Sequence, residues 1–252
     1  MRRLQLNISS RDKLTRLLAR HPWIAVSVSG TLASSIYTIA AHSPLSDPAV
    51  IRASAIDAAV PFLPWAAWPY ATYVLVLPTL VLLASRLVAF ERVLVAAMST
   101  ALSNAAVYLA WPTQLEMRTD APAGTLLALI QRLDTTLCAL PSGHVSLPMA
   151  IATAALLVSF DVHGHVARRW QLLSAFFLMW TIVLAASTLL TRQHYVVDAA
   201  AGAAFGMLVG IIAAARRFTS PVVAPESAHA SGSQGRLDSV CGRLDSVEGG
   251  YV

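Results

Sequence analysis

Six apolar stretches of about 20 residues dominate this chain, and they limit its possible folds more than any other feature. They cover roughly residues 22–41, 67–85, 93–111, 144–160, 171–190 and 195–215. A helix of about 20 residues spans the hydrocarbon core of a bilayer. Inside lipid, only helices and closed barrels satisfy all of their backbone polar groups. The sequence therefore predicts an all-α polytopic membrane protein, built as a six-transmembrane-helix bundle.

The composition agrees with a membrane protein and argues against a nucleic-acid-binding one. Charged residues make up 12% of the chain, whereas a soluble domain carries about 25%. The formal net charge is +5, but the basic residues lie at the ends of the apolar stretches. They do not form the stripe of basic and aromatic residues that is typical of nucleic-acid binding. We expect the bilayer and a lipid as partners, and no nucleic acid.

The chain divides into three parts. Residues 1–21 are basic and predict an N-terminal cytoplasmic segment that can lie on the membrane surface. Residues 22–215 carry the six spans and form the membrane domain. Residues 216–252 are rich in Ser and Gly and contain a tandem seven-residue repeat that starts at Gly235 and again at Gly242. This last part has few large apolar residues, so we expect a disordered cytoplasmic tail.

Basic residues are distributed unequally between the two sides of the predicted bundle. Fourteen of the 18 Lys and Arg residues fall on the side of the two termini, and only Arg52, Arg118, Arg132 and Arg192 fall on the other. Loops rich in Lys and Arg stay in the cytoplasm. The sequence thus predicts cytoplasmic termini, in the inner membrane if the cell is bacterial, with loops 42–66 and 112–143 on the outer face.

Polar residues that carry chemistry gather at the outer ends of the predicted spans. The set is Arg118, Ser142, Gly143, His144, Arg192, His194 and Asp198. The spans were placed from hydropathy alone, yet they bring all of these residues to one face. A carboxylate inside an apolar span is costly and usually marks function. We therefore expect the active site at the outer headgroup region.

His194 and Asp198 are four residues apart at the start of the sixth span. We predict that both lie on one helix, where such residues are neighbours. Asp198 can then accept a hydrogen bond from one imidazole nitrogen, which leaves the other nitrogen free as a nucleophile. The alternative is a structural His–Asp pair that joins helix ends.

The tetrapeptide Pro141-Ser142-Gly143-His144 predicts a helix start. Free amides at a helix N-terminus bind anions, and Gly143 lets a ligand approach the backbone closely. The Ser142 hydroxyl can donate to an oxyanion, and His144 can protonate a leaving alkoxide. The alternative is an ordinary helix cap with an interfacial histidine.

Two arginines complete the predicted phosphate site. We expect Arg118 and Arg192 to bind the nonbridging oxygens of a phosphate by charge-assisted hydrogen bonds. Together with the two histidines and the carboxylate, they make a phosphate site with no metal and no cofactor. Cys138 and Cys241 fall on opposite sides of the membrane, so we expect no disulfide between them, and Cys138 is interpreted as a small apolar filler.

The motifs resemble those of the type 2 phosphatidic acid phosphatase superfamily. The resemblance lies in residues 141–144 and, fifty residues later, His194-Tyr195-Val196-Val197-Asp198, and it covers roughly residues 50–215. Residues 187–198 with Gly202 after them, and residues 108–112 upstream of Arg118, look most like the inositol phosphorylceramide synthase branch.

The resemblance implies a reaction and roles for three residues. His194 attacks phosphorus and forms a phosphohistidine, Asp198 orients His194, and His144 is the general acid and then the general base. The resemblance also implies that no metal is needed. Trp111 and Thr188 stand where the superfamily has a lysine and an arginine, and we expect Arg192 to replace the missing arginine.

The sequence leaves three alternatives to a lipid phosphatase open. The first is a headgroup transferase, in which an alcohol and not water resolves the phosphohistidine. The second is a transporter that uses the polar cluster as a substrate site, although no repeat of two matching halves is visible. The third is a haem protein with His144 and His194 as axial ligands, which leaves Asp198 and both arginines unexplained.

Overall fold

Six helices in the computed structural model are long and apolar enough to cross a membrane. The structure describes residues 20–116, 119–134 and 137–215, all of which belong to one compact unit. The six helices cover Pro22–His42, Pro64–Ala84, Phe90–Ala110, Gly143–Asp161, Gly164–Leu190 and Val196–Ala215. The predicted all-α membrane bundle is therefore confirmed. Most of the basic N-terminal segment, and all of the predicted tail, lie outside the described residues.

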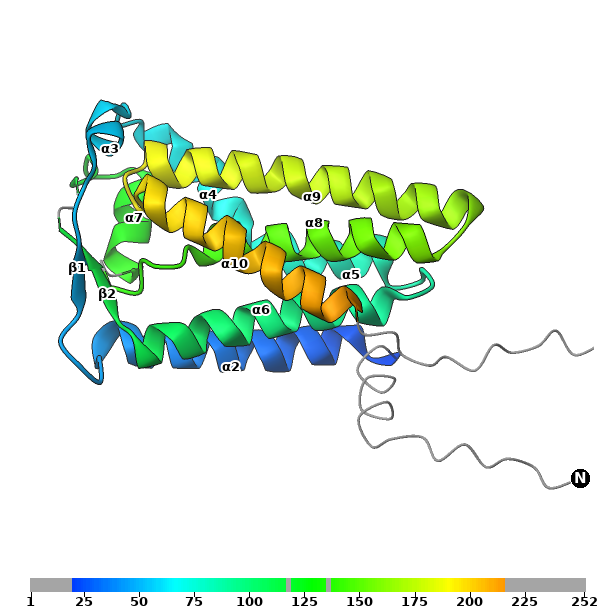
Figure 1. Cartoon of the computed structure of the whole chain (residues 1–252). Coiled ribbons are helices and arrows are strands. Elements are labelled where there is room, and N and C mark those ends of the chain that lie inside the picture. Colours follow the sequence, from blue (N-terminus) through cyan, green and yellow to red (C-terminus); the bar gives the residue numbers. More distant parts are fainter. Residues whose placement is uncertain (1–19, 117–118, 135–136, 216–252) are drawn as a thin grey trace, which may run out of the picture. The chain divides into compact units, whose positions relative to one another are not determined.

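Five of these spans are single α-helices, and one is interrupted. The single helices are α2 (Pro22–His42), α6 (Phe90–Ala110), α8 (Gly143–Asp161), α9 (Gly164–Leu190) and α10 (Val196–Ala215). The second span consists of η1 (Pro64–Ala66), α4 (Ala67–Ala71), η2 (Thr72–Leu75) and α5 (Val76–Ala84). Between spans lie α3 (Ala55–Ala59) and α7 (Leu126–Leu133), which gather at one end of the bundle with two short strands (Figure 1).

The interruption of the second span lies just before Pro78. Proline has no N–H to donate to the preceding turn, and this turn is the 3₁₀ segment η2. The Thr72 hydroxyl donates to the carbonyl of Pro69 (2.7 Å) and accepts from the Trp180 indole of α9 (2.9 Å). These bonds fix the part of the span that carries Tyr70 and Tyr73.

One predicted boundary is wrong by about two helical turns. We expected a turn over residues 161–170, but α9 begins at Gly164, and only Val162 and His163 separate it from α8. Arg168 and Arg169 lie on its exposed first turns. Hydropathy locates the apolar part of a helix, whereas this helix continues with polar residues beyond that part.

A row of glycines brings α10 into backbone contact with α8. Gly202, Gly206 and Gly210 are four residues apart on one face of α10. A Cβ atom added at Gly206 would lie 2.1 Å from the carbonyl oxygen of Ser146, and one at Gly202 would lie 2.5 Å from that of Ser142. Small residues at such spacing let membrane helices approach closely. These glycines therefore form the surface by which α10 packs on α8.

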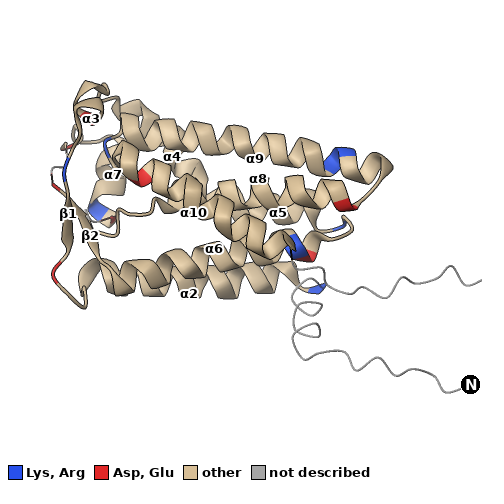
Figure 2. Ribbon diagram, viewed as in Figure 1, with Lys and Arg blue, Asp and Glu red and all other residues tan. Residues whose placement is uncertain are grey.

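The opposite end of α8 and α10 is joined by a buried arginine. Arg92 of α6 forms an ion pair with Asp161 at the end of α8 (2.6 Å) and also donates to the carbonyl of Ala214 near the end of α10. A cation is favourable at the C-terminus of a helix. Charged residues otherwise lie at the two ends of the bundle, with an apolar middle between them (Figure 2).

Two three-residue strands connect the loops at the end where α10 begins. β1 (Ala49–Ile51) pairs with β2 (Thr113–Leu115) in parallel, with Ala49 opposite Thr113. The sequence analysis did not predict them, because three residues are too few to show an alternating pattern. Their pairing fixes the loop after α2 against the loop after α6.

The glycine contact gives a testable expectation for stability. Gly206→Ala should lower the unfolding temperature in detergent, because the new Cβ forces the backbones of α8 and α10 apart. Overpacking of this kind typically costs about 1–3 kcal/mol. Gly30→Ala on α2 is the matched control, since nothing lies within 4 Å of a Cβ added there. Equal unfolding temperatures for the two variants, followed by circular dichroism, would contradict the close approach.

Candidate functional site

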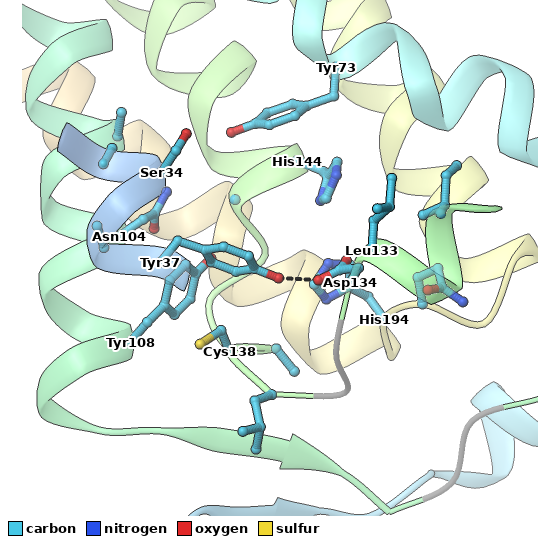
Figure 3. A pocket seen from close by; sticks show the side chains of 18 of the residues that line it. Ser34, Tyr37, Tyr73, Asn104, Tyr108, Leu133, Asp134, Cys138, His144 and His194 are labelled. Atoms are coloured by element: carbon cyan, nitrogen blue, oxygen red, sulfur yellow. Dashed lines mark hydrogen bonds between the residues drawn. The ribbon is translucent and has the colours of Figure 1, made fainter. Parts of the chain in front are cut away.

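A cavity of about 380 Å³ lies at the end of the bundle where α8 and α10 begin (Figure 3). Its walls come from α2, α4, η2, α6, α7 and the loop that leads into α8. Four tyrosines line it, Tyr37, Tyr70, Tyr73 and Tyr108. His144 and His194 line the same cavity, so two histidines fifty residues apart share one space.

His144 is the second residue of α8, and its ring is packed between aromatic side chains. The ring centroid lies 4.3 Å from that of Tyr70 and 4.4 Å from that of Tyr73. The centroid of the His194 ring lies 5.6 Å away, with an angle of 61° between the two ring planes. Both tyrosines belong to the part of the second span around its 3₁₀ turn, so this interruption positions the walls around His144.

His194 lies in the turn between α9 and α10, two residues before α10 begins at Val196. The prediction that His194 and Asp198 share one helix is therefore wrong. The turn reverses at Arg192, which has a positive φ of 53°. The amides of Gln193 and His194 both donate to the carbonyl of Thr188 (3.0 and 3.3 Å). The chain thus leaves α9 in a hydrogen-bonded turn and carries His194 to the cavity.

Asp198 lies next to His194 although the two are not on one helix. Its carboxylate is fully buried, and Oδ2 accepts from the backbone amide of Tyr195 (2.8 Å). The same Oδ2 lies 3.6 Å from Nδ1 of His194. This distance exceeds that of a hydrogen bond. Among the described residues, neither Nδ1 of His194 nor Oδ1 of Asp198 has a hydrogen-bond partner.

Ser142 and Gly143 lie where the predicted helix start places them. Ser142 is buried, and its amide donates to the carbonyl of Asp198 (3.0 Å), which joins the starts of α8 and α10. Its hydroxyl has no partner among the described residues and makes no helix cap. Gly143 lines the cavity, and a Cβ there would lie 3.2 Å from the Tyr108 hydroxyl. The backbone at Gly143 therefore borders the cavity, and a side chain there would crowd the Tyr108 hydroxyl.

The sequence predicts that Arg118 and Arg192 bind phosphate, and the structure describes only Arg192. Arg118 lies outside the described residues. Nη2 of Arg192 donates to the carbonyl of Val60 (3.0 Å), and Arg192 is not among the residues that line the cavity. Within the described part of the chain, no Lys or Arg lines it. The Thr188 hydroxyl donates to the Ala185 carbonyl (2.8 Å) in its own helix. A phosphate-binding role for Arg192 stays a prediction.

The carboxylate of Asp57, in the loop between the first two spans, contacts the start of α10. Its Oδ1 accepts from the amide of Val196, the first residue of α10 (2.7 Å). Its Oδ2 accepts from the amide and the hydroxyl of Ser54 (2.8 and 2.6 Å). Burial opposes ionisation, but these hydrogen bonds outweigh it and hold the pKa of Asp57 below its usual value. In the sequence, the spacing Ser54-x-x-Asp57 is typical of a capping box and indicates that this carboxylate accepts backbone hydrogen bonds at a helix start.

The far wall of the cavity contains a second carboxylate that the sequence did not single out. Tyr37 of α2 donates a hydrogen bond to Asp134, the residue that follows α7 (Figure 3). Asn104 donates to the Ser146 hydroxyl (2.5 Å), and Tyr108 donates to the carbonyl of Pro141 (2.6 Å). These bonds hold α2, α6 and the loop before α8 around one space.

The described residues show no metal-ligand cluster. No group of three or more His, Cys, Asp or Glu side chains in residues 20–116, 119–134 and 137–215 is arranged to hold a metal ion. Cys138 is buried beside the cavity, and burial together with the charge of Asp134 raises the pKa of its thiol to about 12. Cys138 behaves as a packed, protonated thiol, as its interpretation as an apolar filler implies.

Comparison with known proteins finds a match to a family model in the second half of the membrane domain. Residues 111–221 match the model of the PAP2 superfamily. The match includes His144, His194 and Asp198 and extends from the residue after α6 past the end of α10. No curated protein and no solved structure is significantly similar to the chain.

The state of Cys138 can be measured by alkylation. A thiol with a pKa of about 12 is ionised in only about one molecule in 10⁴ at pH 8, and the thiolate is the reactive form. In a Cys241→Ser background, iodoacetamide should modify Cys138 about 10³-fold more slowly in the folded protein than after unfolding in SDS. Equal rates in the two states, followed by mass spectrometry, would show that the thiol is not buried.

Proposed function

We propose that this chain is an integral membrane lipid phosphatase or phosphotransferase of the PAP2 superfamily. It cleaves a lipid phosphate ester or diphosphate through a phosphohistidine. One observation carries the proposal: two histidine rings lie 5.6 Å apart at one cavity, with a buried carboxylate oxygen 3.6 Å from Nδ1 of His194. The family match over residues 111–221 supports it.

In the proposed first step, His194 is the nucleophile. Its Nδ1 faces Asp198, so Nε2 is the nitrogen that attacks phosphorus. A bond forms between Nε2 and phosphorus while the bond from phosphorus to the leaving oxygen breaks. His144 gives a proton to that oxygen. Asp198 stabilises the positive charge that develops on the His194 ring.

In the second step, water or an alcohol resolves the phosphohistidine. The neutral His144 takes a proton from the attacking oxygen, a new phosphorus–oxygen bond forms, and the bond to Nε2 of His194 breaks. Hydrolysis and headgroup transfer differ only in this acceptor, so the same site supports both. An alcohol acceptor makes the chain a transferase, and water makes it a phosphatase.

The start of α8 is the part of the described site that is suited to stabilise the phosphate charge. The Ser142 hydroxyl has no partner there, and a helix N-terminus attracts anions. Preorganised donors of this kind act where negative charge develops in the transition state. We propose that Ser142 and Gly143 bind nonbridging oxygens and that Arg118 adds a cation.

The position of the polar residues favours an enzyme over a transporter. His144 and Asp198 lie in the first turns of α8 and α10, and His194 precedes α10. A transporter site is expected near the middle of the spans, at broken helices of two matching halves. A site at helix ends instead suits a phosphate at the headgroup level of a lipid.

The proposed chemistry is tested by phosphate release from phosphatidate in mixed detergent micelles. His194→Ala and His144→Ala should each lower turnover by about 10³-fold or more, because each removes a group that acts directly on the reacting atoms. Activity should survive EDTA, and orthovanadate should inhibit by mimicking five-coordinate phosphorus. His163→Ala is the control, since His163 is exposed in the turn between α8 and α9.

A strict requirement for a divalent cation would refute this mechanism. Full activity of His194→Ala would refute the role of His194 in particular. Inclusion of glycerol as a competing acceptor separates the two activities, because transfer gives a phosphorylated alcohol whereas hydrolysis gives inorganic phosphate.

We propose further that the cavity opens to the outer face and that the termini are cytoplasmic. The sequence assigns 14 of the 18 basic residues to the side of the termini, and loops rich in Lys and Arg stay in the cytoplasm. In a cysteine-free background, Asp120→Cys in the loop between α6 and α8 should react with a membrane-impermeant maleimide in intact cells. His163→Cys in the turn between α8 and α9 should react only after permeabilisation. The reverse labelling pattern would invert the orientation.

A further inference from the structure

Residues 54–63, which contain α3 and lead into η1, are joined at three points to the turn that carries His194. The amide of Leu63 donates to the carbonyl of Leu190 (2.8 Å). Nη2 of Arg192 donates to the carbonyl of Val60 (3.0 Å). The amide of Val196 donates to Oδ1 of Asp57 (2.7 Å). The three contacts occur before, within and after the turn, so this segment fixes the whole of it.

Asp57 makes the contact that lies nearest to His194. Val196 is only two residues further along the chain, and its amide is the first of α10. The other carboxylate oxygen of Asp57 is held by the amide and the hydroxyl of Ser54 (2.8 and 2.6 Å). The acceptor is therefore charged, fixed in orientation and buried. A carboxylate at a helix N-terminus is also favoured by the helix dipole.

The backbone on both sides of His194 is fixed by this arrangement. On the preceding side, the amides of Gln193 and His194 donate to the carbonyl of Thr188. On the following side, the amide of Tyr195 donates to Asp198, and that of Val196 donates to Asp57. Two carboxylates thus accept hydrogen bonds from two successive backbone amides. Oδ2 of Asp198, which accepts from Tyr195, also lies 3.6 Å from Nδ1 of His194.

We propose that Asp57 is a positioning residue for His194, and that Arg192 supports the same turn through Val60. This inference rests on the proposed function, because it assigns the two residues to the geometry of the proposed nucleophile. Neither residue needs to touch the substrate. An error of about 1 Å in the position of a reacting group can cost about 10²-fold in rate.

The role of Asp57 is tested by turnover of phosphatidate in mixed micelles. Asp57→Ala should lower kcat by about 10- to 100-fold and leave KM within about twofold, because binding groups stay while the nucleophile is displaced. Asp57→Asn should recover most of kcat, since its amide oxygen can still accept from Val196. Asp47→Ala is the matched control, because Asp47 is an exposed carboxylate in the same loop.

A spectroscopic measurement tests positioning without any substrate. In protein labelled with [¹⁵N]histidine, the ring resonances of His194 are identified by their loss in His194→Gln. They should shift in Asp57→Ala and stay in place in Asp47→Ala. If they shift while the wild-type protein releases no phosphate from phosphatidate, positioning stands and the proposed function fails. If the resonances and kcat of Asp57→Ala both match those of the wild type, Asp57 is merely structural and the proposal is overturned.

The role of Arg192 is tested by combining substitutions. If Arg192 and Asp57 act on one turn, the losses in kcat of Arg192→Gln and Asp57→Ala should not multiply in the double variant. If Arg192 binds the phosphate, as predicted from the sequence, Arg192→Gln should raise KM for phosphatidate and the two losses should multiply. That second result would overturn the positioning role of Arg192. The positioning role of Asp57 would then be decided by the His194 resonances in Asp57→Ala.

Discussion

The backbone contact between α8 and α10 is the constraint on which the rest of the site depends. Three glycines remove the side chains that would separate the two helices, and the amide of Ser142 then reaches the carbonyl of Asp198 (3.0 Å). This one hydrogen bond sets the start of α8 against the start of α10. His144 follows Ser142 by two residues, and His194 precedes Asp198 by four. Their separation at the cavity is therefore determined by helix packing in the apolar part of the membrane domain.

Much of this architecture could be predicted from the sequence, and the reason is physical. Apolar stretches must span the bilayer as helices, so hydropathy located all six spans and brought His144, His194 and Asp198 to one end. The start of α9 was misplaced because helices continue beyond the apolar region. The relation of His194 to Asp198 was also misjudged: a spacing of four suggested one helix, but the positive φ at Arg192 shows that the chain turns there first. Contacts between distant loops, such as Asp57 with Val196, leave no periodic signal.

Two buried carboxylates, those of Asp57 and Asp198, lie at the end of the bundle where α10 begins, and each accepts a hydrogen bond from a backbone amide. An unpaired charge in an apolar surrounding is strongly unfavourable. The first amides of a helix have no partner within their own helix, and a carboxylate that accepts from them satisfies both groups. Asp198 accepts from Tyr195, and Asp57 accepts from Val196. The start of α10 therefore holds two carboxylates near the histidine that is proposed to become positively charged during the reaction.

The residues around the site come from a longer part of the chain than the one that matches the family model. Residues 111–221 contain the two histidines and Asp198, but the groups that surround them come also from elements before this region. Tyr70 and Tyr73 pack against His144, Tyr37 closes the cavity by its bond to Asp134, and Asp57 holds the start of α10. The matched region contains the residues proposed to react, and the earlier spans and loops contribute side chains that surround them and part of the walls of the cavity.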